Sequence, residues 1–118
     1  MPETLPLVFG LLDDQALHIC IDMQRIFLEP GPWFAEAGLD LLPMIDQLVH
    51  ARNLPTFFTR FITPSTAMEA SGRWQTYYEF WHKVTKEEAG EELLALHPNL
   101  QKFANSENTF DKATYDAF

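Results

Sequence analysis

The chain has 118 residues, enough for one domain, and 47% of them are hydrophobic, which is sufficient for a packed core. Asp and Glu number 17 against 8 Lys and Arg, and the formal net charge of -9 makes binding to nucleic acid or to an anionic membrane unfavourable. The apolar stretches are far shorter than the ~20 residues of a membrane span, and residues 1–12 lack the basic start of a signal peptide.

The beginning of the chain predicts a leader and then a strand. Residues 1–15 contain two prolines and are expected to form a loosely attached leader before a domain at 16–118. The apolar, partly β-branched run at 16–21 predicts a strand buried on both faces. It contains the only cysteine, Cys20, so an internal disulfide is excluded and a cytoplasmic location is expected.

The next elements are separated by proline and glycine. Residues 29–33 must form a loop, because they include two prolines and a glycine. Apolar residues at helical spacing predict a helix at 39–53, followed by a second strand at 54–60 and a loop at 61–72. A further helix is predicted by aromatic residues that repeat along one helical face: Trp74, Tyr77, Tyr78 and Trp81.

The last part of the chain contains a charged stretch at 86–92, expected to be solvated, and a short third strand at 108–111. An order of strand, helix, strand, long connection and strand is typical of parallel α/β folds. Such sheets bind ligands beyond the carboxyl ends of their strands. Asp22, Arg60 and Lys112 each lie at such an end, so they are the leading candidates for a site.

Each of these residues also has a structural interpretation. Asp22 could be an acid or base, or it could cap the following turn. Lys112 taken alone resembles a surface lysine. Arg60 could hold a substrate carboxylate or pair with an acidic side chain, and the aromatic face that includes Trp74 could pack against the sheet or a partner subunit, or line a pocket.

Two motifs carry a resemblance to a known family. Residues 18–27 (HICIDMQRIF) run from an apolar strand into Asp-x-Gln, with Phe27 three residues later. Residues 111–118 (DKATYDAF) contain Lys-x-x-Tyr-x-x-Phe, beginning at Lys112. Both resemble motifs of the isochorismatase-like cysteine hydrolases, in the same order. The resemblance covers 16–118, and the segments between the motifs are similar to an uncharacterised branch outside the nicotinamidases.

The resemblance implies a three-layer α-β-α fold with a Rossmann-like parallel sheet, of which this chain supplies the first half. It implies a hydrolase of small amide-like substrates with a C–N bond, in which Asp22 is the acid or base and Lys112 its cationic partner. The nucleophilic cysteine is expected on a fourth strand beyond Phe118, among about three further units of ~30 residues. Cys20 does not replace it, because a mid-strand cysteine is expected to be a small buried hydrophobe.

The expected ligand is a small molecule, bound by Phe27, Trp33, Arg60 and Trp74. Vinyl-ether hydrolysis of the isochorismatase type, with Asp22 as acid, is an alternative. A catalytically inactive truncated product or pseudoenzyme, acting as a structural half, is another. A homo-oligomer or a complementary C-terminal segment is expected as partner, because the run at 17–21 would otherwise present an unpaired apolar edge.

We expect neither a metal nor another cofactor. The spacing of the histidines does not suggest metal ligation: His18, His50, His82 and His97. The nicotinamidase branch has an Asp-x-His metal pair after the second strand, where this chain has Arg60-Phe61-Ile62. The scattered glycines form no phosphate-binding loop.

Overall fold

The computed structural model of the protein describes residues 15–51 and 55–114. The predicted leader, apart from Gln15, lies outside the described residues. So do the last two residues of the helix predicted at 39–53, and the tyrosine and phenylalanine of the lysine motif.

A parallel sheet of three strands forms the centre of the described structure. β1 (His18–Ile21) pairs with β2 (Thr56–Phe61), and β2 pairs with β3 (Thr109–Lys112), so the order is β1-β2-β3. In the register, Ile21 lies opposite Thr59, and Phe61 lies opposite Lys112. The predicted parallel α/β fold is therefore confirmed, and each strand begins or ends within two residues of its predicted bounds.

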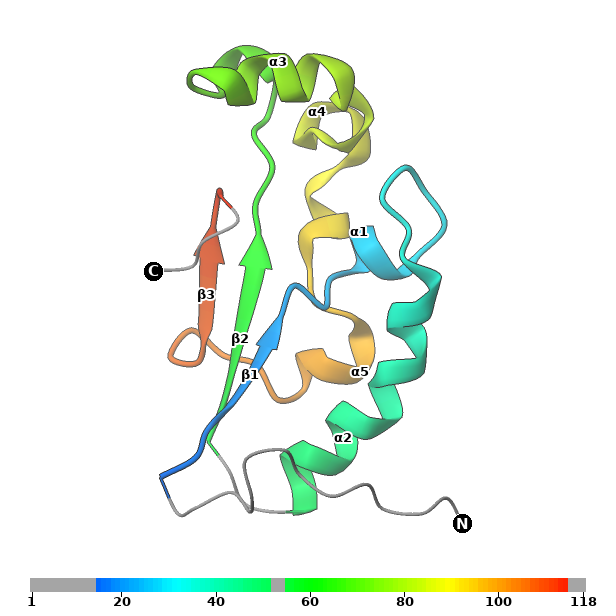
Figure 1. Cartoon of the computed structure of the whole chain (residues 1–118), viewed down its shortest axis with the longest axis vertical. Coiled ribbons are helices and arrows are strands. Elements are labelled where there is room, and N and C mark those ends of the chain that lie inside the picture. Colours follow the sequence, from blue (N-terminus) through cyan, green and yellow to red (C-terminus); the bar gives the residue numbers. More distant parts are fainter. Residues whose placement is uncertain (1–14, 52–54, 115–118) are drawn as a thin grey trace.

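Helices cover one face of this sheet (Figure 1). They are α1 (Arg25–Leu28), α2 (Leu42–Ala51) and α5 (Pro98–Gln101). The single helix predicted at 39–53 is divided, because its start forms the 3-10 helix η1 (Glu36–Leu41) and Pro43 lies in the first turn of α2. Phe58 is fully buried between the sheet and this layer, in a core that also contains Cys20, Ile45 and Leu100.

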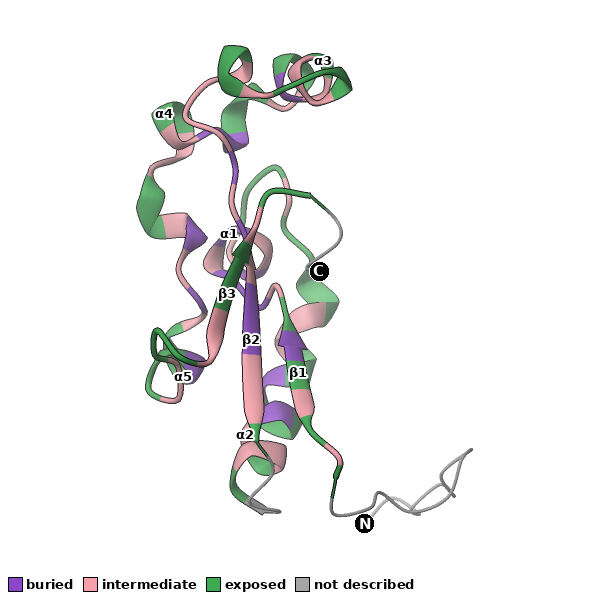
Figure 2. Cartoon of the chain, turned by 90° about the vertical axis from the view of Figure 1, so that its left-hand side faces the viewer, coloured by how far each residue is buried: buried purple, intermediate pink, exposed green. Residues whose placement is uncertain are grey.

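The opposite face of the sheet is uncovered among the described residues (Figure 2). Ile21 is 60% exposed, and Ile19 and Phe110 are also exposed. The prediction that the first strand is buried on both faces is therefore wrong here, because its residues alternate between a covered and an open face. The described residues supply the sheet and one helical layer of the predicted three-layer architecture, with β1 at one edge.

The connection from β2 to β3 is long and lies largely beyond the carboxyl end of β2 (Figure 1). Before it reaches α5, it forms five short helices: η2 (Ala67–Glu69), α3 (Arg73–Phe80), η3 (His82–Val84), α4 (Lys86–Ala89) and η4 (Glu91–Leu94). Three aromatic residues of α3, Trp74, Tyr77 and Tyr78, pack with Phe61, Val84 and Leu94 to form a second core. Across the described part of the chain, none of the helices has the length and apolar character needed to traverse a bilayer.

Candidate active site

The chain turns sharply at the end of β1, and this turn sets the position of Asp22. The φ angle of Asp22 is 57°, in the left-handed region that costs a residue with a Cβ about 1–2 kcal/mol, although aspartate tolerates it better than most. The Asp22 N–H donates to the carbonyl of Thr59 at 3.1 Å and so makes the last backbone hydrogen bond between the two strands here. The carboxylate is thereby held at the carboxyl edge of the sheet.

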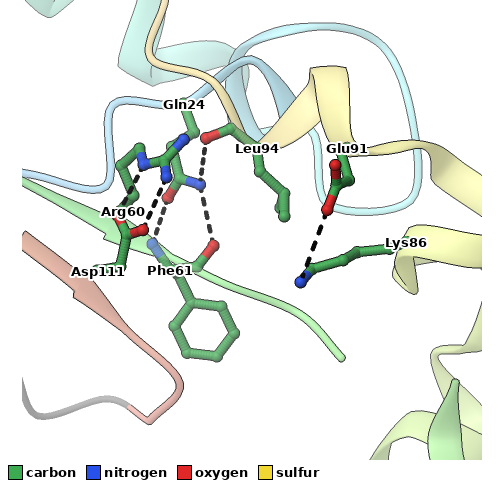
Figure 3. Close-up of polar contacts among 7 residues, drawn as sticks. All are labelled: Gln24, Arg60, Phe61, Lys86, Glu91, Leu94 and Asp111. Carbon is green, nitrogen blue, oxygen red and sulfur yellow. Dashed lines mark hydrogen bonds and ion pairs between the residues drawn. The ribbon is translucent and has the colours of Figure 1, made fainter. Parts of the chain in front are cut away.

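The side chain of Gln24 continues the pairing where the backbone of β1 departs. Its Oε1 accepts from the Phe61 N–H at 2.6 Å, and its Nε2 donates to the carbonyls of Phe61 at 2.9 Å and Leu94 at 2.8 Å (Figure 3). Gln24 is fully buried. An amide side chain has the donor and acceptor of a peptide unit, so Gln24 replaces the residue that a longer β1 would place beside Phe61.

Asp22 and Lys112 meet at this edge, as the sequence predicts. The Lys112 Nζ lies 3.0 Å from the Asp22 Oδ2, and the two side chains are only 8% and 23% exposed. Lys112 reaches across the end of β2, with its ammonium 5.7 Å from the ring centre of Phe61. The other carboxylate oxygen, Oδ1, accepts a hydrogen bond from the Thr59 hydroxyl at 2.9 Å.

A pocket of about 390 Å³ opens beside this ion pair. Asp22 supplies its charged wall, and the remaining lining is apolar or aromatic: Phe27, Pro32, Trp33, Phe34, Phe61 and Tyr77. A single carboxylate among aromatic side chains suits a small molecule that is mostly apolar and has one polar reacting group. The predicted binding residues Phe27 and Trp33 both lie here.

Trp33 is the centre of the aromatic wall. It stacks on Phe27 with ring centres 5.8 Å apart and planes 2° from parallel, and it meets Phe61 edge-on at 6.1 Å. It also contacts Tyr77 at 6.2 Å, so the loop at 29–34 is held against α3. Offset aromatic pairs of this kind contribute about 0.5–1.5 kcal/mol each beyond their buried area.

Arg60 does not reach this pocket. Strand residues alternate between faces, so Arg60 points to the side of the sheet opposite Phe61, where its guanidinium makes two hydrogen bonds of 2.7 Å with Asp111 (Figure 3). These bonds lower the pKa of Asp111 below its ordinary value. Arg60 and Asp111 line a separate hollow of about 520 Å³, whose lining does not include Asp22, so we assign Arg60 no role in binding substrate at the Asp22 pocket.

Trp74 lies behind the aromatic rings that line the pocket. It contacts Phe61 at 6.4 Å and Tyr77 at 5.2 Å, both of which line the pocket, but it is not itself part of the lining. The predicted contact between Trp74 and substrate is therefore indirect in this structure. Trp74 therefore packs against the sheet, which is one of the two roles considered for the aromatic face, rather than lining the pocket.

Cys20 lies in the core on the covered face, only 3% exposed. Burial, together with the nearby charge of Asp22, raises the pKa of the Cys20 thiol to about 11. A thiol acts as a nucleophile through its thiolate, so Cys20 is unsuited to attack a substrate. Among residues 15–51 and 55–114, no group of three or more His, Cys, Asp or Glu side chains is placed to hold a metal ion.

Two polar residues of this site, Gln24 and Thr59, were not singled out by sequence reasoning. Gln24 belongs to the Asp-x-Gln motif, but its contacts depend on where β1 ends. Thr59 gives a weaker signal, as a polar residue that lies between Phe57 and Phe61 on one face of β2.

Comparison with known proteins agrees with this architecture. The family model of the isochorismatase domain matches residues 16–118, so the chain belongs to the isochorismatase family of hydrolases. A cysteine hydrolase from Pseudomonas syringae pv. phaseolicola 1448A has a similar fold, with a TM-score of 0.64 and 19% sequence identity. The similarity covers 86% of this chain and 48% of that one, so the chain spans about half of its length. No curated protein matches the chain.

Proposed function

We propose that Asp22 and Lys112 form the acid–base part of a site that hydrolyses a small amide. The observation that carries the proposal is their 3.0 Å ion pair beside an apolar pocket, in a chain of the isochorismatase family. A cysteine thiol would complete the site, and it would come from outside these 118 residues because Cys20 is buried in the core.

The two described side chains have separate tasks in this proposal. The Asp22 carboxylate takes the proton of the incoming thiol, and the thiolate forms a bond to the amide carbonyl carbon. Asp22 then gives the proton to the leaving nitrogen as the C–N bond breaks, which leaves a thioester. Water attacks the thioester while Asp22 accepts its proton, and that proton returns to the departing sulfur. The Lys112 ammonium stabilises the negative charge of the Asp22 carboxylate and of the thiolate.

The apolar pocket supports an uncharged substrate. Asp22 is the only charged residue that the structure places in the pocket lining, so a substrate carboxylate bound there would have no lining cation to pair with. The aromatic rings of Phe27 and Trp33 offer a flat wall for an apolar group, with the amide directed toward Asp22. We infer that the preferred substrates are neutral amides with a small apolar or planar substituent.

The test is to incubate the whole product of the gene with a panel of neutral and acidic small amides and to measure release of ammonia. Neutral amides should be hydrolysed, and Asp22→Asn should abolish turnover. Asp46→Asn, a matched change on the exposed surface of α2, should leave it unchanged. Absence of turnover on every amide would contradict the proposal.

A second candidate function is hydrolysis of a vinyl ether. It is favoured by one observation, namely that Asp22, which lines the pocket, could serve as the acid that such a reaction needs. The same proteins should be incubated with a small enol ether and the carbonyl product measured. Turnover of the ether without turnover of any amide would favour this candidate.

A further inference from the structure

The Thr59 hydroxyl lies between β2 and the turn that carries Asp22. Thr59 is only 2% exposed, and its Oγ1 is 2.9 Å from Asp22 Oδ1. The Asp22 N–H also points toward this hydroxyl oxygen, at 3.2 Å, in addition to its bond with the Thr59 carbonyl. Side chain and backbone of Asp22 are therefore both bonded to one residue of the neighbouring strand.

These contacts fix the direction of the hydroxyl proton. A threonine hydroxyl has one proton to donate and lone pairs to accept with. Because the Asp22 N–H occupies the accepting side, the proton is directed to the carboxylate. The β-branched side chain of threonine has few rotamers in a strand, so the oxygen itself is also held in place.

The two carboxylate oxygens of Asp22 thus have different partners. Oδ1 accepts from Thr59, and Oδ2 lies against the ammonium of Lys112. Without the hydrogen bond from Thr59, the carboxylate could rotate about its Cβ–Cγ bond. The left-handed backbone conformation of Asp22 would also lose one of the hydrogen bonds that stabilise it.

We propose that Thr59 is a positioning residue, which orients the Asp22 carboxylate so that Oδ2 faces Lys112 and the pocket. Thr59 does not touch the substrate and transfers no proton. The inference rests on the proposed function only for its effect on turnover, because the orientation of the ion pair can be measured without a substrate.

The experiment compares Thr59→Val, which keeps the shape but removes the hydroxyl, with Thr59→Ser, which restores it. Thr56→Val is the matched control, because Thr56 is at the amino end of the same strand, away from Asp22. In the whole product of the gene, Thr59→Val should lower kcat by about 10- to 100-fold, as expected for a misplaced catalytic group, with KM changed less than about threefold. Thr59→Ser should recover most of kcat.

The second readout is acetylation of Lys112, measured by peptide mass spectrometry against the exposed Lys83. Thr59→Val and Asp22→Asn should both increase labelling of Lys112, because its ion pair is loosened or lost, whereas Thr59→Ser and Thr56→Val should not. Circular dichroism melting shows whether each variant is folded at the assay temperature.

The outcomes separate the two proposals. If no variant and no wild-type protein hydrolyses an amide, the proposed function fails, and the labelling of Lys112 alone decides the role of Thr59. Equal labelling of Lys112 in wild type and Thr59→Val would overturn the inference. So would an unchanged kcat in an active Thr59→Val protein, since a purely structural threonine would affect only the melting temperature.

Discussion

Replacement of Gln24 by leucine should strongly destabilise the junction between the ends of β1 and β2. Leucine is similar in size but makes no hydrogen bonds, so the N–H of Phe61 and the carbonyls of Phe61 and Leu94 would each lose the partner that Gln24 provides. A buried backbone group without a partner costs about 1–3 kcal/mol, so we expect a loss of about 3–6 kcal/mol after some relaxation. That is a large part of a typical total of about 5–15 kcal/mol.

Urea unfolding of the whole gene product, followed by tryptophan fluorescence, measures this loss, because Trp33 lies close to the junction through Phe61. The matched control is Gln47→Leu on the exposed side of α2, which should change stability by less than about 0.5 kcal/mol. A loss below about 1 kcal/mol for Gln24→Leu would refute the reasoning. It would mean that Gln24 does not replace a backbone residue of β1.

Three further predictions concern residues outside the pocket. Cys20 should resist iodoacetamide at pH 7 in the folded protein and react in urea, because a pKa of about 11 leaves only ~10⁻⁴ of the thiol ionised; rapid native labelling in a peptide map would contradict this. Asp111→Asn should cost only about 0.5–1 kcal/mol, because the pair with Arg60 is 49% and 31% exposed. Arg60 lowers the pKa of Asp111 below 3.8, so the ion pair should stabilise the fold above pH 3.8 and lose this effect as the pH falls further. The free energies of unfolding of wild type and Asp111→Asn, measured with urea, should therefore become equal in acid. The 118-residue chain alone should self-associate through its open sheet face, and Ile21→Lys should shift its elution in size-exclusion chromatography toward the monomer; a monodisperse wild-type monomer would contradict this.

The positions of Asp22 and Lys112 could be predicted from the sequence because they depend on simple rules. Asp22 follows an apolar strand and Lys112 ends a short third strand, and the carboxyl ends of parallel strands meet at one edge of a sheet. The long side chain of Lys112 then spans β2, so the prediction did not require the two strands to be neighbours.

The orientation of Arg60 could not be predicted, because it depends on register. Phe61 lies opposite Lys112, and alternation therefore directs Arg60 and Asp111 to the other face. The sequence contains no residue pattern that distinguishes this register from one shifted by a single residue. The contact between Thr59 and Asp22 was missed for the same reason, since it follows from the pairing of Ile21 with Thr59.

Loop residues were the hardest to place. Trp33 was expected to bind the substrate, but it lies in the loop at 29–33, where periodicity does not indicate the direction of a side chain. Its stacking on Phe27 results from the path of the loop between α1 and η1. The open face of β1 was also missed, since an apolar run does not reveal which elements cover it.

The central claim is that Asp22 and Lys112 act as one catalytic unit, and a double-mutant cycle of turnover tests it most directly. Kcat/KM for the best amide is measured for the whole gene product and its Asp22→Asn, Lys112→Met and doubly substituted variants, each checked for folding by circular dichroism. We predict that each single change lowers kcat/KM by about 10²–10⁴-fold and that the double change costs little more, because residues that act as a unit are not additive. A folded single variant with wild-type kcat/KM, or losses that multiply in the double variant, would contradict the account.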